Sequence, residues 1–214
     1  MYRLPKNKEM TLDLLNEFLV KHSQDVARRY KKLYKAYTSD HDILHEPKKP
    51  AYKPDNRIVI NFPKYIVDTM NGYFLGNPVK IIADDEAVMD YVEYIDQYNN
   101  QDNNNAELAK ICSIYGKGYE MYFADEDAEP CITYLDPIES FMIFDESILE
   151  RPLYFIRRYT DRDGVERGSI SNATHVRNFK VTGEMEWVDD WEPHYFPGVP
   201  ATEYVENAER QGLF

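Results

Sequence analysis

The sequence has little cysteine, which excludes several classes of protein. Only two cysteines, Cys112 and Cys131, occur among its 214 residues. They do not form a C-x-x-C pair, and no matched pair of histidines accompanies them, so neither a disulfide framework nor a structural zinc site is expected. A reducing compartment suits such a chain better than an oxidising one.

Positive charge is also scarce. Lysine and arginine number 25 against 38 aspartates and glutamates, which gives a net charge of -13. A protein that holds DNA by its phosphates needs clustered lysine and arginine to release counterions. The chain as a whole is therefore not expected to grip DNA. The charge indicates simple solubility, or a protein past which DNA moves without binding.

Long apolar runs are absent as well. The longest apolar stretch, Ile58 to Leu75, is broken by polar side chains, so no membrane span is expected. No apolar segment follows the first six residues, so no signal peptide is expected either. What the chain does have is 43% hydrophobic residues, typical of an ordered protein, and 18 tyrosines, which suit water-facing assembly interfaces.

The N-terminal half shows helical periodicity. Apolar residues at three- and four-residue steps predict helices over 11–36, 63–75, 84–98 and 106–115, with Gly76 and Gly116 closing the second and fourth. The asparagine-rich residues 99–105 are expected to cap the fourth helix, and residues 78–82 to form a short strand. The block from Ile58 to Val79 is predicted to be buried core, with Ile66 as a representative member.

From Tyr119 onward the apolar period changes from helical to two. This alternation predicts strands near residues 119–123, 131–135, 141–143, 153–159, 165–171 and 175–181. Asp161 to Gly164 is typical of a hairpin turn, and Gly183 indicates another. Helices thus precede strands, which predicts an α+β fold whose second part is an antiparallel β-rich region.

One group of basic residues stands out against the acidic background. Its members lie in the last turns of the first predicted helix: Arg28, Arg29, Lys31, Lys32 and Lys35. Cations are favourable at the C-terminal end of a helix dipole, so a solvated helix face explains the group. The alternative is an interaction patch for phosphate or for an acidic partner.

Catalytic, metal-binding and cofactor-binding patterns are missing. The acidic groups 84–86, 125–127 and 189–190 are contiguous, which is typical of solvated turns rather than of acid/base pairs. His41 and His45 are four residues apart, but the neighbouring prolines disfavour the helix that would let them share a metal. No nucleophile elbow, phosphate loop or zinc-protease pattern occurs. We therefore expect no enzyme, no metal and no cofactor.

Beyond single motifs, the chain contains a series of short sequence segments in a particular order. They cover residues 34–44, 56–61, 64–68, 72–79, 136–137, 144–145, 156–159 and 200–211. In this order they resemble portal proteins of tailed, siphophage-type bacteriophages, specifically the N-terminal wing portion. The sequence departs from that pattern at Tyr37 to Asp40, where the family's second tyrosine and glycine are absent.

The resemblance implies a structural subunit of the head-to-tail connector. Such a subunit closes with about a dozen copies of itself into a ring, through which double-stranded DNA is packaged and ejected. The implied partners are the major capsid and scaffolding proteins and, through regions beyond the wing, the terminase motor and head-completion proteins; DNA passes through without tight binding. The implied location is the capsid vertex of the virion, after assembly in the cytoplasm of the bacterial host.

The resemblance also implies a division of the chain. Residues 1–57 are expected to form a helical arm and linker, residues 58–206 an α+β wing domain, and residues 207–214 the start of a truncated stem helix, with stem, clip and crown otherwise absent. Two other functions stay open. One is a different phage head or adaptor protein, and the other is a metal-dependent hydrolase that uses the acidic loops.

Overall fold

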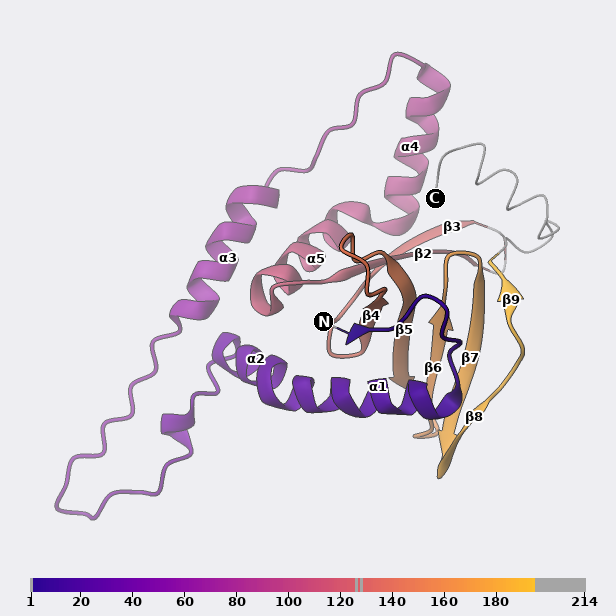
Figure 1. The fold of residues 1–214 in the computed structure, drawn as a ribbon. Coiled ribbons are helices and arrows are strands. Elements are labelled where there is room, and N and C mark those ends of the chain that lie inside the picture. The colour runs from indigo at the N-terminus through magenta and orange to yellow at the C-terminus, as the bar shows by residue number, and fades with distance from the viewer. Residues whose placement is uncertain (1, 126, 128, 195–214) are drawn as a thin grey trace. The chain divides into compact units, whose positions relative to one another are not determined.

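The computed structural model describes residues 2–125, 127 and 129–194, and the chain divides into two compact units. The first unit joins residues 1–23 to residues 119–214, and the second comprises residues 24–118. Figure 1 shows the course of the chain through both. These units do not follow the expected boundary at residue 57, which stays a prediction. The expected stem start at 207–214 lies outside the described residues.

The first predicted helix is present and contains a feature that the periodicity did not indicate. It consists of α1 (Leu12–Asp25), a π-helical turn (Val26–Tyr30) and α2 (Lys31–Tyr37). The Thr11 hydroxyl accepts a hydrogen bond from the amide of Leu14 at 3.3 Å, so Thr11 caps the helix start. The π turn widens the helix by one residue where the first unit passes into the second.

The first unit is built on a sheet that runs in the order β1-β4-β5-β6-β7-β8, with β9 also paired to β7. All its pairings are antiparallel except that of β1 with β4. The strands are β1 (Tyr2–Arg3), β4 (Ser140–Phe144), β5 (Pro152–Thr160), β6 (Glu166–Ser171), β7 (His175–Thr182), β8 (Glu184–Trp187) and β9 (Glu192–Pro193). A separate hairpin pairs β2 (Tyr119–Ala124) with β3 (Pro130–Leu135).

The fold class and the predicted strands after residue 119 are confirmed. In β4 to β7 the alternation arises because one side of each strand faces a hydrophobic core. In that core, Leu15, Phe18 and Leu19 of α1 pack against residues of the sheet. The sheet contributes Phe141, Ile143, Ile156, Ile170 and Phe179, each buried almost completely. Strands β1, β8 and β9 were not predicted.

The second unit is helical. After a single 3-10 turn (Asp42–Leu44) it contains α3 (Phe62–Leu75), α4 (Glu86–Asn99) and α5 (Gln101–Tyr115), and α5 contacts α2, α3 and α4. The prediction that residues 99–105 only cap the last helix is wrong, because α5 begins at Gln101. Asn100 takes the left-handed conformation (φ 49°) and turns the chain between α4 and α5.

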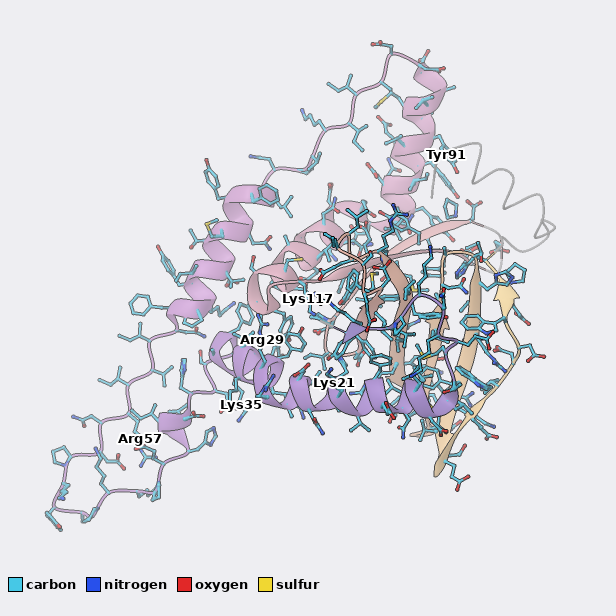
Figure 2. All side chains as sticks on the ribbon, viewed as in Figure 1. Lys21, Arg29, Lys35, Arg57, Tyr91 and Lys117 are labelled. Carbon is cyan, nitrogen blue, oxygen red and sulfur yellow. The ribbon has the colours of Figure 1, made fainter. Side chains whose placement is uncertain are left out.

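The linker before α3 is held by one side chain. The guanidinium of Arg57, labelled in Figure 2, donates to the carbonyl oxygens of Leu44, Glu46 and Pro47 at 3.2, 2.6 and 2.8 Å. It also pairs with the carboxylate of Asp55 at 3.0 Å. These contacts close the proline-rich segment into a loop, although that segment has no regular secondary structure of its own.

Two predictions for residues 58–82 are wrong. Residues 78–82 have no regular secondary structure, so the predicted strand does not form. The block from Ile58 to Val79 is not core, because Val67 is the one residue of α3 that is buried. The apolar stripe of α3 exists, but most of it faces away from α5: Ile66 is 58% exposed and Tyr73 90%.

This arrangement makes a direct prediction about two neighbouring residues. Ile66→Ala is expected to change the free energy of unfolding by less than about 0.5 kcal/mol, because the side chain is exposed. Val67→Ala, the matched control, removes a buried side chain (8% exposed) and is expected to cost about 1–3 kcal/mol. Urea denaturation followed by circular dichroism measures both. A larger cost for Ile66→Ala than for Val67→Ala would contradict this placement of α3.

Candidate functional site

The five predicted basic residues form one exposed surface of the second unit. Arg28, Lys31, Lys32 and Lys35 follow one another at three- and four-residue steps, so they share a side of the helix, and Arg29 flanks them. All five side chains are exposed, and no acidic residue occurs between Val26 and Ser39. We call Arg28, Arg29, Lys31, Lys32 and Lys35 the basic face.

The basic face is only partly neutralised by the chain itself. Arg28 pairs with Asp25 at 2.9 Å, and Lys35 pairs with Asp40 at 3.3 Å. Hydrogen bonds from His45 and then from Lys35 lower the pKa of Asp40 below its usual value. Among the described residues, no ion pair involves Lys31 or Lys32. These two lysines are therefore available to an acidic partner.

The helix that carries the basic face is anchored from its opposite side. Val26 and Tyr30 are buried, and the ring of Tyr30 meets the ring of Tyr115 edge-on with centroids 5.7 Å apart. Tyr115 lies in the last turn of α5. The cations consequently point outward from a helix whose position relative to the C-terminal end of α5 is fixed.

A sixth cation that sequence reasoning missed lies beside the basic face. The Lys117 ammonium stands 5.7 Å from the centre of the Tyr30 ring, on which the Arg29 guanidinium also lies at 5.9 Å. Figure 2 labels Arg29, Lys35 and Lys117 in this region. Gly116 ends α5 in a left-handed conformation (φ 80°) and brings Lys117 to this ring. The Gly-Lys-Gly sequence indicated only a helix end.

Helix α4 presents a second, oppositely charged surface. No lysine or arginine occurs between Lys80 and Lys110. None of its residues is buried, and its most exposed side carries three acids and three tyrosines. We call these residues the acidic tyrosine face: Glu86, Asp90, Glu93, Tyr91, Tyr94 and Tyr98. The rings of Tyr94 and Tyr98 stack with centroids 5.8 Å apart, which holds the aromatic part in place.

The acidic loops stabilise local turns. The carboxylate of Asp85 accepts from the amide of Ala87 at 2.9 Å and caps α4. Asp125 accepts from the amides of Asp127 and Glu129, both at 3.0 Å. Asp189 accepts from the amide of Asn178 at 2.7 Å. Within the described ranges no three His, Cys, Asp or Glu side chains come together in a way that could hold a metal ion.

The hairpin turn predicted at Asp161 to Gly164 joins β5 to β6. Asp161 accepts from the amides of Asp163 and Val165 at 3.0 and 2.9 Å, and from the guanidinium of Arg167 at 2.5 Å. The hydrogen bond from Arg167, followed by those from the backbone, lowers the pKa of Asp161. Its carboxylate is thus committed to the turn. His45, one of the two histidines that lie four residues apart, contacts Asp40.

A third surface of the second unit is apolar. Exposed large hydrophobic residues occupy α3 and the irregular segments on both sides of it. They are Ile58, Ile60, Phe62, Tyr65, Ile66, Met70, Tyr73, Phe74, Val79, Ile81 and Ile82. So many exposed large hydrophobic residues in one stretch of chain are unusual for a monomer and typical of a protein that buries them in an assembly. None of the helices in the described part of the chain has the length and apolar character of a membrane span.

Comparison with known proteins assigns a family to this arrangement. No match was found among curated proteins. The family model described as "Phage portal protein, SPP1 Gp6-like" matches residues 16–214, a range that contains the basic face, α3, α4 and all strands except β1. Because this match covers most of the chain, the chain belongs to the family of phage portal proteins of the SPP1 Gp6 type.

Proposed function

We propose that the chain is a structural subunit of the portal ring, the head-to-tail connector that forms a channel for double-stranded DNA. Family membership is the observation that carries this proposal. Portal proteins are structural and not enzymatic, so the prediction that the chain is not an enzyme is confirmed. The family also implies an oligomeric ring and a position at the capsid vertex of the virion. Packaging and ejection of DNA through that ring are the proposed activity.

The two units of the chain support this role in different ways. The first unit has its own hydrophobic core between α1 and the sheet, so it can fold as a stable support. The second unit exposes apolar, basic and acidic surfaces that a solitary subunit would leave in water. A ring subunit needs different surfaces on its two sides, because each copy meets its neighbours head to tail.

The partners follow from the proposed place in the virion. The chain is proposed to contact about a dozen copies of itself in the ring, together with the major capsid and scaffolding proteins. Contacts with the terminase motor and the head-completion proteins are assigned to regions outside the wing. Within the chain, residues 1–57 serve as a helical arm and linker and residues 58–206 as the wing domain in this proposal. Assembly takes place in the cytoplasm of the bacterial host.

Labelling of whole virions tests the proposal. An epitope inserted at Gly164, where the turn between β5 and β6 has open space, should leave the sheet intact. Electron microscopy with gold-labelled antibody is expected to show label at one capsid vertex, and quantitative mass spectrometry about a dozen copies per virion. Label over the whole capsid surface or along the tail would indicate the alternative, another phage head or adaptor protein.

The charge of the chain makes a prediction about DNA. Duplex DNA is expected to bind no more tightly than the non-specific range of about 10⁻⁴ to 10⁻⁶ M at physiological salt, because a net charge of -13 opposes it. Fluorescence anisotropy with a labelled duplex measures the affinity. Residual binding at low salt should fall when Lys31 and Lys32 are replaced by glutamate. A dissociation constant in the nanomolar range at 150 mM salt would contradict a passive channel component.

A further inference from the structure

We propose that the basic face of one subunit docks on the acidic tyrosine face of the next copy of the chain. This inference rests on the proposed ring and identifies the contact that orients neighbouring subunits head to tail. The two faces are different surfaces of the same unit, which is what a head-to-tail contact requires. The sequence leaves the basic face open between a solvated helix face and an interaction patch, and family membership assigns no partner to either face.

The position of the two faces suits such a contact. The basic face is tied to the C-terminal end of α5 through the rings of Tyr30 and Tyr115. The acidic tyrosine face belongs to α4, which joins the N-terminal end of α5 at Asn100. Helix α5 has 15 residues and therefore separates its two ends by about 22 Å. Figure 2 shows Tyr91 on α4, well away from Arg29, Lys35 and Lys117. One subunit can thus contact two neighbours at once.

The two faces carry opposite charges, and within the described part of one chain they form no ion pairs with each other. Among the described residues, no ion pair joins the basic face to α4; Arg28 and Lys35 use Asp25 and Asp40 instead. Lys31 and Lys32 have no such pairing, and Glu86, Asp90 and Glu93 likewise appear in no described ion pair. Docking would place four or more cations opposite three carboxylates, an arrangement that favours one partner and one orientation.

Tyrosine gives the contact more than charge alone. Tyr91 is 58% exposed, and Tyr94 and Tyr98 are close to half exposed. A lysine ammonium or an arginine guanidinium over a tyrosine ring is attracted to its π face, most strongly when water is excluded. The basic face also has an aromatic neighbour: Tyr34 of α2 is half exposed and lies next to the cations. Each face therefore has an aromatic part that can be buried and a charged part that surrounds it.

A second copy of the chain fits the basic face better than nucleic acid does. DNA offers only negative charge, so it would leave the acidic tyrosine face of the same unit without a partner and would be repelled by it. A second copy satisfies both faces with one kind of contact, repeated around the ring. DNA is the competing occupant of the basic face alone, and the experiment below separates the two.

Charge reversal in two variants tests the contact. The first variant carries Lys31→Glu and Lys32→Glu, and the second carries Asp90→Lys and Glu93→Lys. Each variant alone is expected to self-associate about tenfold more weakly than the unaltered chain, because like charges then face each other. In an equal mixture, each altered face meets a complementary face on the other variant, so association should return to within about threefold of the original. Sedimentation velocity measures the self-association of each variant and of the equal mixture.

Control variants and alternative results keep the outcomes distinct. The control variant carries Lys6→Glu and Lys8→Glu, at two exposed positions of the sheet-containing unit. It changes the net charge by the same amount as the first variant and should leave self-association unaltered. Rings that form equally well in both reversed variants would overturn the proposed contact while leaving the portal function intact. A chain that stays monomeric at every attainable concentration would overturn the contact too. If the first variant lost DNA binding while its self-association stayed equal to that of the unaltered chain, the basic face would be assigned to nucleic acid.

Zero-length cross-linking gives an independent readout. A carbodiimide joins a lysine ammonium directly to a carboxylate with which it is in contact. In a mixture of isotopically labelled and unlabelled chains, we expect mixed cross-links between Lys31 or Lys32 and Asp90 or Glu93. Mixed cross-links found only between other residues would show that subunits meet elsewhere. That result would reject the contact, whereas failure of the virion labelling described above would reject the portal role itself.

Discussion

Gly168→Ala is expected to destabilise the first unit by about 3 kcal/mol or more. A Cβ atom at this position of β6 would lie 2.3 Å from Cζ of Phe179 and 2.4 Å from the carbonyl oxygen of Arg157. Phe179 is 1% exposed and belongs to the hydrophobic core, and the Arg157 carbonyl belongs to the backbone of the adjacent strand β5. The methyl group can therefore be accommodated only if β5 and β6 separate.

Tryptophan fluorescence during urea denaturation measures this effect, because Trp187 and Trp191 both lie in the first unit. Gly164→Ala and Gly183→Ala are matched controls: no atom lies within 4 Å of either added Cβ, and only the left-handed backbone resists the change. Each control should cost about 1–2 kcal/mol. Phe179→Leu, which shortens the side chain, should recover part of the loss in the Gly168→Ala background. A stability equal to that of the unaltered chain would show that β6 is not packed as described.

The strands could be predicted because burial on one side imposes a pattern on the sequence. Phe141 and Ile143 alternate with residues that face the other side of the sheet, and the same holds for β5 to β7. Strand β1 could not be found in this way. It has two residues, and its partner β4 lies about 140 positions further along the chain. Such a strand is defined by tertiary contacts and leaves no periodicity.

The burial of α3 was predicted wrongly for a related reason. An apolar stripe shows that a helix face is to be covered, but it does not show whether the cover comes from the same chain or from another. In the isolated chain Val67 faces inward, whereas Ile66, Met70 and Tyr73 remain exposed. The apolar stripe therefore predicts that α3 is a helix, but it does not predict which surface covers the stripe. In the proposed ring, the exposed stripe of α3 is a surface on which copies of the chain or other partners meet.

The candidate site was predictable in part. The five members of the basic face were found from the sequence because they are consecutive in one helix. Lys117 and the acidic tyrosine face were not, since Lys117 reaches Tyr30 only through the left-handed turn at Gly116. The acidic group 84–86 is interpreted from the sequence as a solvated turn, and no role is assigned there to Asp90 or Glu93. That the two surfaces carry complementary charges can be recognised only from the three-dimensional arrangement of the helices.

The second large effect is expected at His22, a polar side chain that is 1% exposed in the core of the first unit. Its Nε2 lies 3.1 Å from the carbonyl oxygen of Ile138, which can only accept, so Nε2 carries the hydrogen. In the neutral ring, Nδ1 accepts from the hydroxyl of Tyr2 at 3.0 Å. The ring also stacks on Phe141 with centroids 4.4 Å apart. His22 thus links α1 to β1 and to β4.

His22→Ala is expected to lower the free energy of unfolding by about 3–5 kcal/mol, because it leaves a cavity against Phe141 and removes the partner of a buried carbonyl. Tyr2→Phe should cost less, about 1–2 kcal/mol, since it removes one hydroxyl and keeps the ring. The two changes share one hydrogen bond, so the double variant should be more stable than the sum of the single effects predicts, by about 1 kcal/mol. Denaturation curves for the three variants measure this coupling, with His45→Ala, at an exposed loop position, as the control. Full additivity of the two changes would mean that Tyr2 does not bond to His22, and that the short parallel strand β1 is held to the sheet by its pairing with β4 alone.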